Sequence, residues 1–92
     1  GDDAQALKLG KRAVALMERI QPSDPWQSAE LLNTLGLVQM RLGDLAESRD
    51  YLERAIRIYH HSFPSEDSRR AEAEKTLRMV LKMQEKIEQL QH

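Results

Sequence analysis

A few clusters of polar side chains have the residue types that chemistry needs, and each has a simpler role. His60 and His61 could bind a metal, but adjacent residues on a helix point about 100° apart, whereas a helical zinc site uses histidines four residues apart. We expect both to act as cations near a helix end, where the helix dipole favours positive charge. The acidic pairs Asp2-Asp3 and Glu66-Asp67 are expected to be first-turn charges at helix starts.

No combination of residues indicates an enzyme. The sequence has no nucleophile–base pair, no glycine-rich phosphate loop and no metal-ligand spacing. It has no cysteine, which excludes disulfides, thiolate metal sites and a cysteine nucleophile. We therefore predict a protein without catalytic activity, cofactor, metal or small-molecule substrate.

The charge balance argues against two further classes of partner. Lys plus Arg number 14 and Asp plus Glu number 15, a net charge of -1, whereas nucleic-acid binders normally carry a basic excess. Arg69-Arg70 is too short to be a basic patch. No apolar run is long enough to cross a bilayer, so we expect no membrane partner. The lack of cysteine fits a reducing compartment, and we expect a cytoplasmic protein.

The elements that carry these residues form an internal repeat. The chain aligns with itself at an offset of about 42 residues, without an insertion. The matched residues include glycine–aspartate and proline–serine pairs as well as apolar positions: Gly1-Asp2 with Gly43-Asp44, Arg12-Ala13 with Arg54-Ala55, Pro22-Ser23 with Pro64-Ser65, Ala29-Glu30 with Ala71-Glu72, Thr34-Leu35 with Thr76-Leu77, and Val38 with Val80.

Apolar residues at helical spacing, separated by turn residues, predict an all-α fold of four helices in one domain, residues 1–92. The first covers 3–20, with a break at 21–23. A helix pair covers 25–61, with Asp24 as N-cap, Pro25 at the first helical position, and Gly43-Asp44 as the turn between the helices. The last covers 66–91, with Ser65 as its cap. The positions expected to face inward in the first helix are Ala6, Leu9, Ala13, Leu16, Met17 and Ile20.

The helix pair resembles a tetratricopeptide repeat. The family pattern has a large apolar residue followed by Leu-Gly, then Gly-Asp at the turn, a small residue, and later a large apolar residue and Ala. The corresponding residues here are Leu32, Leu35-Gly36, Gly43-Asp44, Ser48, Leu52 and Ala55. The period exceeds the usual one of about 34 residues, which resembles the longer kinesin-light-chain-like subtype. The resemblance implies an antiparallel helix-turn-helix solenoid fragment in the order B, A-B, A.

The last helix departs from this pattern, because Arg78 takes the place of Gly36. We expect no further helix to pack there, since a charge would be buried. The helix then caps the solenoid with a polar outer face. Alternatively, its apolar residues at heptad-like spacing form a homodimer contact, with Val80, Met83, Ile87 and Leu90 as the self-association residues.

The resemblance also implies a function: a protein–protein interaction scaffold that binds a peptide or helix of a partner protein in the groove formed by its A helices. The alternative is a homo-oligomerisation element of a larger protein. Asn33 and Lys75 align with the lysine of the family's carboxylate clamp, but Leu37 and Met79 replace its asparagine, so we expect no clamp. The groove residues by this analogy are Glu30, Asn33, Leu37, Met40 and Arg41 in one helix, and Glu72, Lys75, Met79, Lys82 and Met83 in the other.

Overall fold

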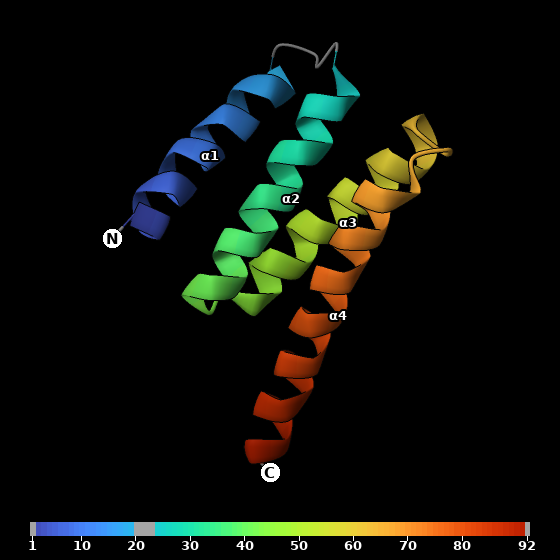
Figure 1. Ribbon diagram of the computed structural model, residues 1–92. Helices are drawn as coiled ribbons and strands as arrows, with labels where there is room; N and C mark the ends of the chain where they lie inside the picture. Colours follow the sequence, from blue (N-terminus) through green and yellow to red (C-terminus); the bar gives the residue numbers. More distant parts are fainter. Residues whose placement is uncertain (1, 20–23, 92) are drawn as a thin grey trace.

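The computed structural model describes residues 2–19 and 24–91, and these residues form helices and no strand. The elements are α1 (Asp2–Arg19), α2 (Pro25–Leu42), α3 (Leu45–Ser62) and α4 (Asp67–Leu90). Consecutive helices run in alternate directions, and α4 extends past the end of α3 (Figure 1). The prediction of an all-α fold is confirmed. The predicted break at 21–23, the end of the first helix at residue 20 and the aligned glycine at position 1 lie outside the described residues.

The caps of α2 and α3 form as their sequences predict. The Asp24 carboxylate accepts a hydrogen bond from the backbone N–H of Gln27 at 3.2 Å. The Asp44 carboxylate accepts one from the N–H of Glu47, also at 3.2 Å. Between the two helices, Gly43 has φ of 88°, a left-handed conformation that a residue with a Cβ adopts only at a cost. These local signals place the α2–α3 turn.

The predicted cap of α4 is wrong by one residue. The N-cap is Glu66, not Ser65, and its side chain makes no capping hydrogen bond to the helix. The backbone N–H of Glu66 donates to the carbonyl of Phe63 at 3.0 Å, so Ser65 lies inside the turn. The Glu66 carboxylate accepts instead from the Ser68 hydroxyl at 2.6 Å, and this bond lowers the pKa of Glu66 below its usual value.

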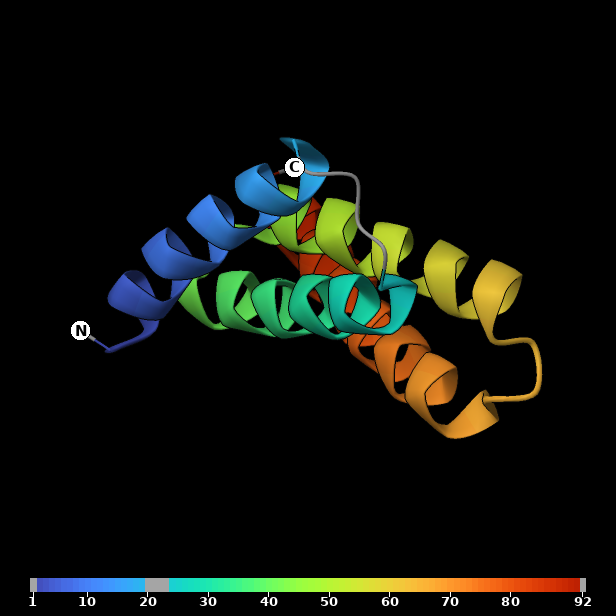
Figure 2. The same cartoon turned by 90° about the horizontal axis from the view of Figure 1, so that it is seen from above.

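Small residues let α2 and α3 pack closely, and this pair has the largest helix–helix interface. The buried Ser48 hydroxyl donates to the carbonyl of Gly36 at 2.5 Å. A Cβ on Gly36 would lie 2.5 Å from Cγ of Leu52. The pairing predicted from small residues therefore forms, with Gly36 against Leu52 as its closest point. In Figure 2, where the molecule is seen from above, α1 and α3 are drawn on the same side of α2.

The packing face of α1 differs from the predicted one. Leu9, expected to face inward, is 64% exposed, and Ala6 is also exposed. The buried position is Gly10, where an added Cβ would collide with Leu35 of α2, while Leu7 packs at the edge of the same core. α1 packs mainly on α2, through the side that carries Leu7 and Gly10, and Leu9 lies on a side that α2 does not cover. The side chains of the other expected positions, 13, 16, 17 and 20, lie outside the described residues.

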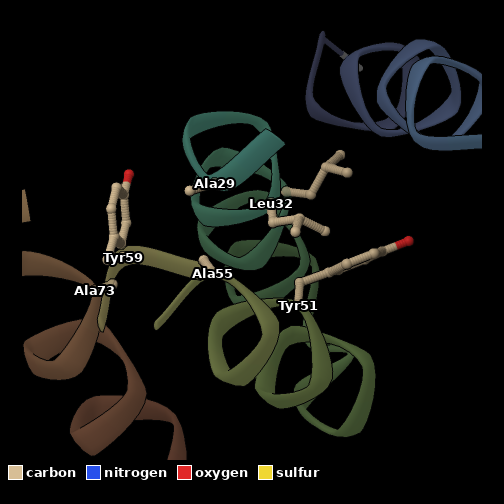
Figure 3. Close-up of a cluster of buried hydrophobic side chains, with 7 residues drawn as sticks. Ala29, Leu32, Tyr51, Ala55, Tyr59 and Ala73 are labelled. Atoms are coloured by element: carbon tan, nitrogen blue, oxygen red, sulfur yellow. The ribbon is translucent and has the colours of Figure 1, made fainter. Parts of the chain in front are cut away.

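The core lies around α3 and joins it to both neighbouring helices. One cluster contains Ala29 and Leu32 of α2, Tyr51, Ala55 and Tyr59 of α3, and Ala73 of α4 (Figure 3). Trp26 packs edge-to-face on Tyr59 and Phe63, with ring centroids 5.7 and 5.0 Å apart. A second cluster joins Leu45, Leu52 and Val80. The ring of Tyr59 thereby connects α2, α3 and α4.

Gln39 is the exception in this interior. Its side chain is buried, and its Nε2 has no hydrogen-bond partner within residues 2–19 and 24–91. A buried amide without a partner loses its hydration and gains nothing in return, at a cost of about 1–3 kcal/mol. We therefore expect Gln39→Met, which keeps the length of the side chain, to raise the free energy of unfolding by about 1 kcal/mol.

Urea denaturation followed by far-UV circular dichroism measures this change. The control is Gln27→Met, an exposed position, which is expected to leave the urea midpoint unchanged. A lower midpoint for Gln39→Met than for the wild-type chain would contradict the prediction.

Candidate functional site

The two predicted groove carboxylates lie at one end of the structure, where α2 and α4 begin. Glu30 accepts a hydrogen bond from the hydroxyl of Tyr59. The guanidinium of Arg69 lies 3.6 Å from Glu30 and 3.9 Å from Glu72. Arg69, in the first turn of α4, thus lies between the second turns of α2 and α4 and brings the two predicted residues together. Its single positive charge offsets only one of the two carboxylates, and the Glu72 side chain is 63% exposed, so this end of α2 and α4 keeps a net negative charge.

Tyr59 is the buried member of this network. Burial, followed by its hydrogen bond to Glu30, raises the pKa of the Tyr59 hydroxyl well above its ordinary value of 10.0. The hydroxyl therefore stays protonated and donates to the carboxylate throughout the pH range in which proteins are usually studied. This hydrogen bond orients the Glu30 carboxylate.

The other predicted positions of α2 divide between the core and the surface. Asn33 and Leu37 are half-buried, and Arg41 is exposed. Met40 is half-buried against the cluster of Leu45, Leu52 and Val80, so part of its side chain belongs to the core. Of the two apolar groove positions predicted in α2, Leu37 is therefore the one that neither core cluster includes.

The predicted positions of α4 are more open to solvent. Lys75 and Lys82 are exposed and take part in no ion pair with the described residues. Met79 and Met83 are 40% and 41% exposed, large values for apolar side chains. Successive residues of this helix at spacings of three and four share one side, which places both methionines on the same side as Ile87 and Leu90. We call Met79, Met83, Ile87 and Leu90 the apolar stripe.

One of the predicted self-association residues is wrong. Val80 is completely buried against Leu45 and Leu52 of α3, so it cannot contact a second chain. Ala73, one heptad earlier, is buried in the same way. The expected heptad seam is thus divided, because α3 occupies its first part. Met83, Ile87 and Leu90 remain exposed, the last at 79%.

The sequence signals missed Arg69 and Tyr59 as partners of the groove carboxylates. Glu72 lies one helical turn after Arg69, and this spacing indicates their contact. No local signal connects Tyr59 or Arg69 to Glu30, because these contacts depend on how α3 and α4 fold back on α2. The groove predicted by family analogy also omits Lys86, an exposed residue one turn after Lys82 on the same side of α4.

The remaining clusters of polar residues do not form a chemical site. His60 lies 3.4 Å from the guanidinium of Arg70, measured from its Nδ1 atom. Within the described residues no group of three or more His, Cys, Asp or Glu side chains is arranged to hold a metal. None of the helices in the described part of the chain has the length and apolar character needed to cross a membrane.

Comparison with known proteins identifies the central helix pair. Residues 29–62, which cover α2 from Ala29 and all of α3, match the tetratricopeptide repeat family. No curated protein matches the chain. No solved structure matches it either.

Proposed function

We propose, from the match of residues 29–62 to the tetratricopeptide repeat family, that the chain binds a peptide or helix of a partner protein on the side of α2 and α4 that carries the predicted groove residues. Repeats of this family generally mediate protein–protein interaction. The single observation that carries the proposal is the partial exposure of Leu37, Met79 and Met83, which α3 leaves uncovered.

The chemistry of this side suits a polypeptide ligand. Methionine side chains are flexible and polarisable, so they adapt to apolar side chains of different shapes. Asn33 can pair with a peptide backbone through its amide, and Lys75 supplies a cation for a carboxylate. Lys75 and Lys82 are exposed cations of α4, whereas Glu30 and Glu72 share the single guanidinium of Arg69.

Selection of peptides from a random displayed library, followed by affinity measurements with purified protein, tests the proposal. We expect Met79→Ser to weaken binding of the selected peptides by roughly tenfold, about the loss of one apolar anchor. Leu81→Ser is the matched control, because Leu81 is 38% exposed and lies two residues away on another side of α4. Failure to select any peptide, or equal losses in the two variants, would contradict the proposal.

Self-association through Met83, Ile87 and Leu90 is the second candidate, favoured by the exposure of these three side chains. Sedimentation equilibrium over a concentration series distinguishes it from the first. A mass that rises with concentration and returns to the monomer value in Ile87→Ser supports a homodimer. A mass that stays at the monomer value up to high micromolar protein concentration would contradict the homodimer.

A further inference from the structure

The apolar stripe of α4 is bordered by basic residues on one side only. Lys75, Lys82 and Lys86 are all exposed. Counted around an ideal helix, they lie about 60 to 100° to the same side of Met83, and so form a row along the stripe. The opposite edge of the stripe is where α4 turns towards α3, which covers Ala73 and Val80.

No acidic residue of α4 forms an ion pair with this row in the described part of the chain. Asp67 and Glu74 pair with Arg70, at 2.7 and 3.4 Å. Glu72, one turn before Lys75, pairs with Arg69. Glu85 and Glu88 lie about 140 to 160° from Met83, nearly opposite the stripe, although Glu85 is only about 60° around the helix from Lys82. The lysine row takes part in no ion pair with the described residues, and its positive charge is therefore available to a ligand.

We infer that the apolar stripe and the lysine row together form a docking site for an amphipathic helix of a partner protein, with Asp or Glu side chains along one edge of the partner's own apolar face. This inference rests on the proposed function and names the partner's chemistry. The apolar residues of the partner pack on Met79, Met83 and Ile87, while its carboxylates pair with the lysines.

The site favours a helical ligand over an extended one. An extended peptide gains affinity by pairing its backbone with a sheet edge, and the described residues contain no strand. Along α4 the backbone groups are used within the helix, so only side chains are offered to the ligand. Apolar residues separated by three or four positions are the pattern that a second helix fills with its own side chains.

Charge also argues against a second, antiparallel copy of this chain as the occupant. When two identical helices pair in antiparallel orientation along one seam, the same edge of each helix meets across the interface. The lysine row of one copy would then face the lysine row of the other, and like charges at such positions destabilise pairing. A partner helix with acidic side chains along this edge would instead be attracted to the lysine row.

Two synthetic helices test the inference. Both are about 18 residues long, enough to form a measurable helix, and both have a leucine stripe; one has glutamate along the edge of the stripe and the other has lysine. By fluorescence anisotropy at low salt, we expect the wild-type chain to bind the glutamate helix at least about fivefold more tightly, which corresponds to roughly 1 kcal/mol. Added salt is expected to reduce this preference, because it screens exposed charges.

A variant with the charges of the lysine row reversed tests whether these lysines cause the preference. K75E/K82E/K86E is expected to invert the preference, so that the lysine helix binds more tightly. Because this triple variant lowers the net charge by six, from -1 to -7, a control of equal net charge is needed. The matched control reverses three exposed basic residues of α1 and α3, Lys8, Arg12 and Arg57, and is expected to keep the wild-type preference although its net charge is the same.

Several outcomes would overturn the inference. Two concern the wild-type chain: equal affinity for the two synthetic helices, or no binding to either. Two concern variants: a preference that K75E/K82E/K86E leaves unchanged, or self-association of the wild-type chain that is lost in Ile87→Ser. Stronger binding to anionic lipid vesicles than to the glutamate helix would assign the stripe to a membrane surface. If library-selected peptides bind and depend on Met79 but carry no acidic edge, the proposed function stands and this inference alone fails.

Discussion

Gly36→Val is expected to destabilise the folded chain by about 3 kcal/mol, at the upper end of the usual cost of overpacking a core. A Cβ at this position would lie 2.5 Å from Cγ and 2.7 Å from Cδ2 of Leu52. Leu52 is completely buried, so it has no open space to move into. The hydroxyl of Ser48 holds α3 at the same point through its bond to the carbonyl of Gly36. Urea denaturation measures the loss as a lower midpoint.

A double-variant cycle separates this collision from a general effect of replacing glycine. We expect Gly36→Ala combined with Leu52→Ala to cost less than the sum of the two single changes, since the smaller residue 52 makes room for the new Cβ. Gly43→Ala is the control for backbone strain, because its Cβ would meet nothing within 4 Å while its φ is positive. It is expected to cost only about 1 kcal/mol. Additive losses at 36 and 52 would show that the helices do not meet there.

Tyr59→Ala is expected to cost about 3–5 kcal/mol, the range for removing a buried aromatic ring. Tyr59 is completely buried and is the largest such side chain in the described part of the molecule. Its ring belongs to the cluster that contains Ala29 of α2 and Ala73 of α4, so the loss weakens two helix interfaces together. A domain of this size has a total stability of about 5–15 kcal/mol, and thermal denaturation should show a much lower Tm.

Tyr59→Phe isolates the contribution of the hydroxyl. The ring and its packing remain, and only the hydrogen bond to Glu30 is lost, so we expect a cost of about 1 kcal/mol. Arg69 still lies beside Glu30 in this variant, so the half-buried carboxylate keeps a partner. A loss for Tyr59→Phe as large as that for Tyr59→Ala would mean that the hydrogen bond, and not the packed ring, joins the helices.

Many features of the fold could be predicted because their causes are local. Gly43 and Asp44 predict a turn through their own backbone and side-chain preferences, and the structure has that turn. The buried positions of α2 and α3 recur at helical spacing, since both helices have neighbours on the sides that carry these residues. Leu9 shows where this reasoning stops: spacing identifies an apolar side, but burial requires another helix to cover it.

The candidate site was predicted with less success for the same reason. Glu30 and Glu72 were expected to face a ligand. Tyr59 of α3 and Arg69 of α4 contact Glu30 from helices that are distant in sequence, whereas Glu72 contacts Arg69 within α4. Val80 was grouped with the self-association residues, and α3 buries it. Met79 and Met83 stay exposed where they were expected to be. Their assignment to a ligand site remains a prediction.

Residue order and residue type alone were enough for the four helices, the turn at Gly43 and the family of the central pair, because propensities, caps and spacing act within a few residues. Tertiary packing decided which apolar side chains of α4 stay exposed. Its apolar residues extend over more than one side, and the position of α3 selects which of them are buried. That position depends on the close approach of Gly36 and Leu52 and on the ring of Tyr59, contacts between residues that lie far apart along the chain.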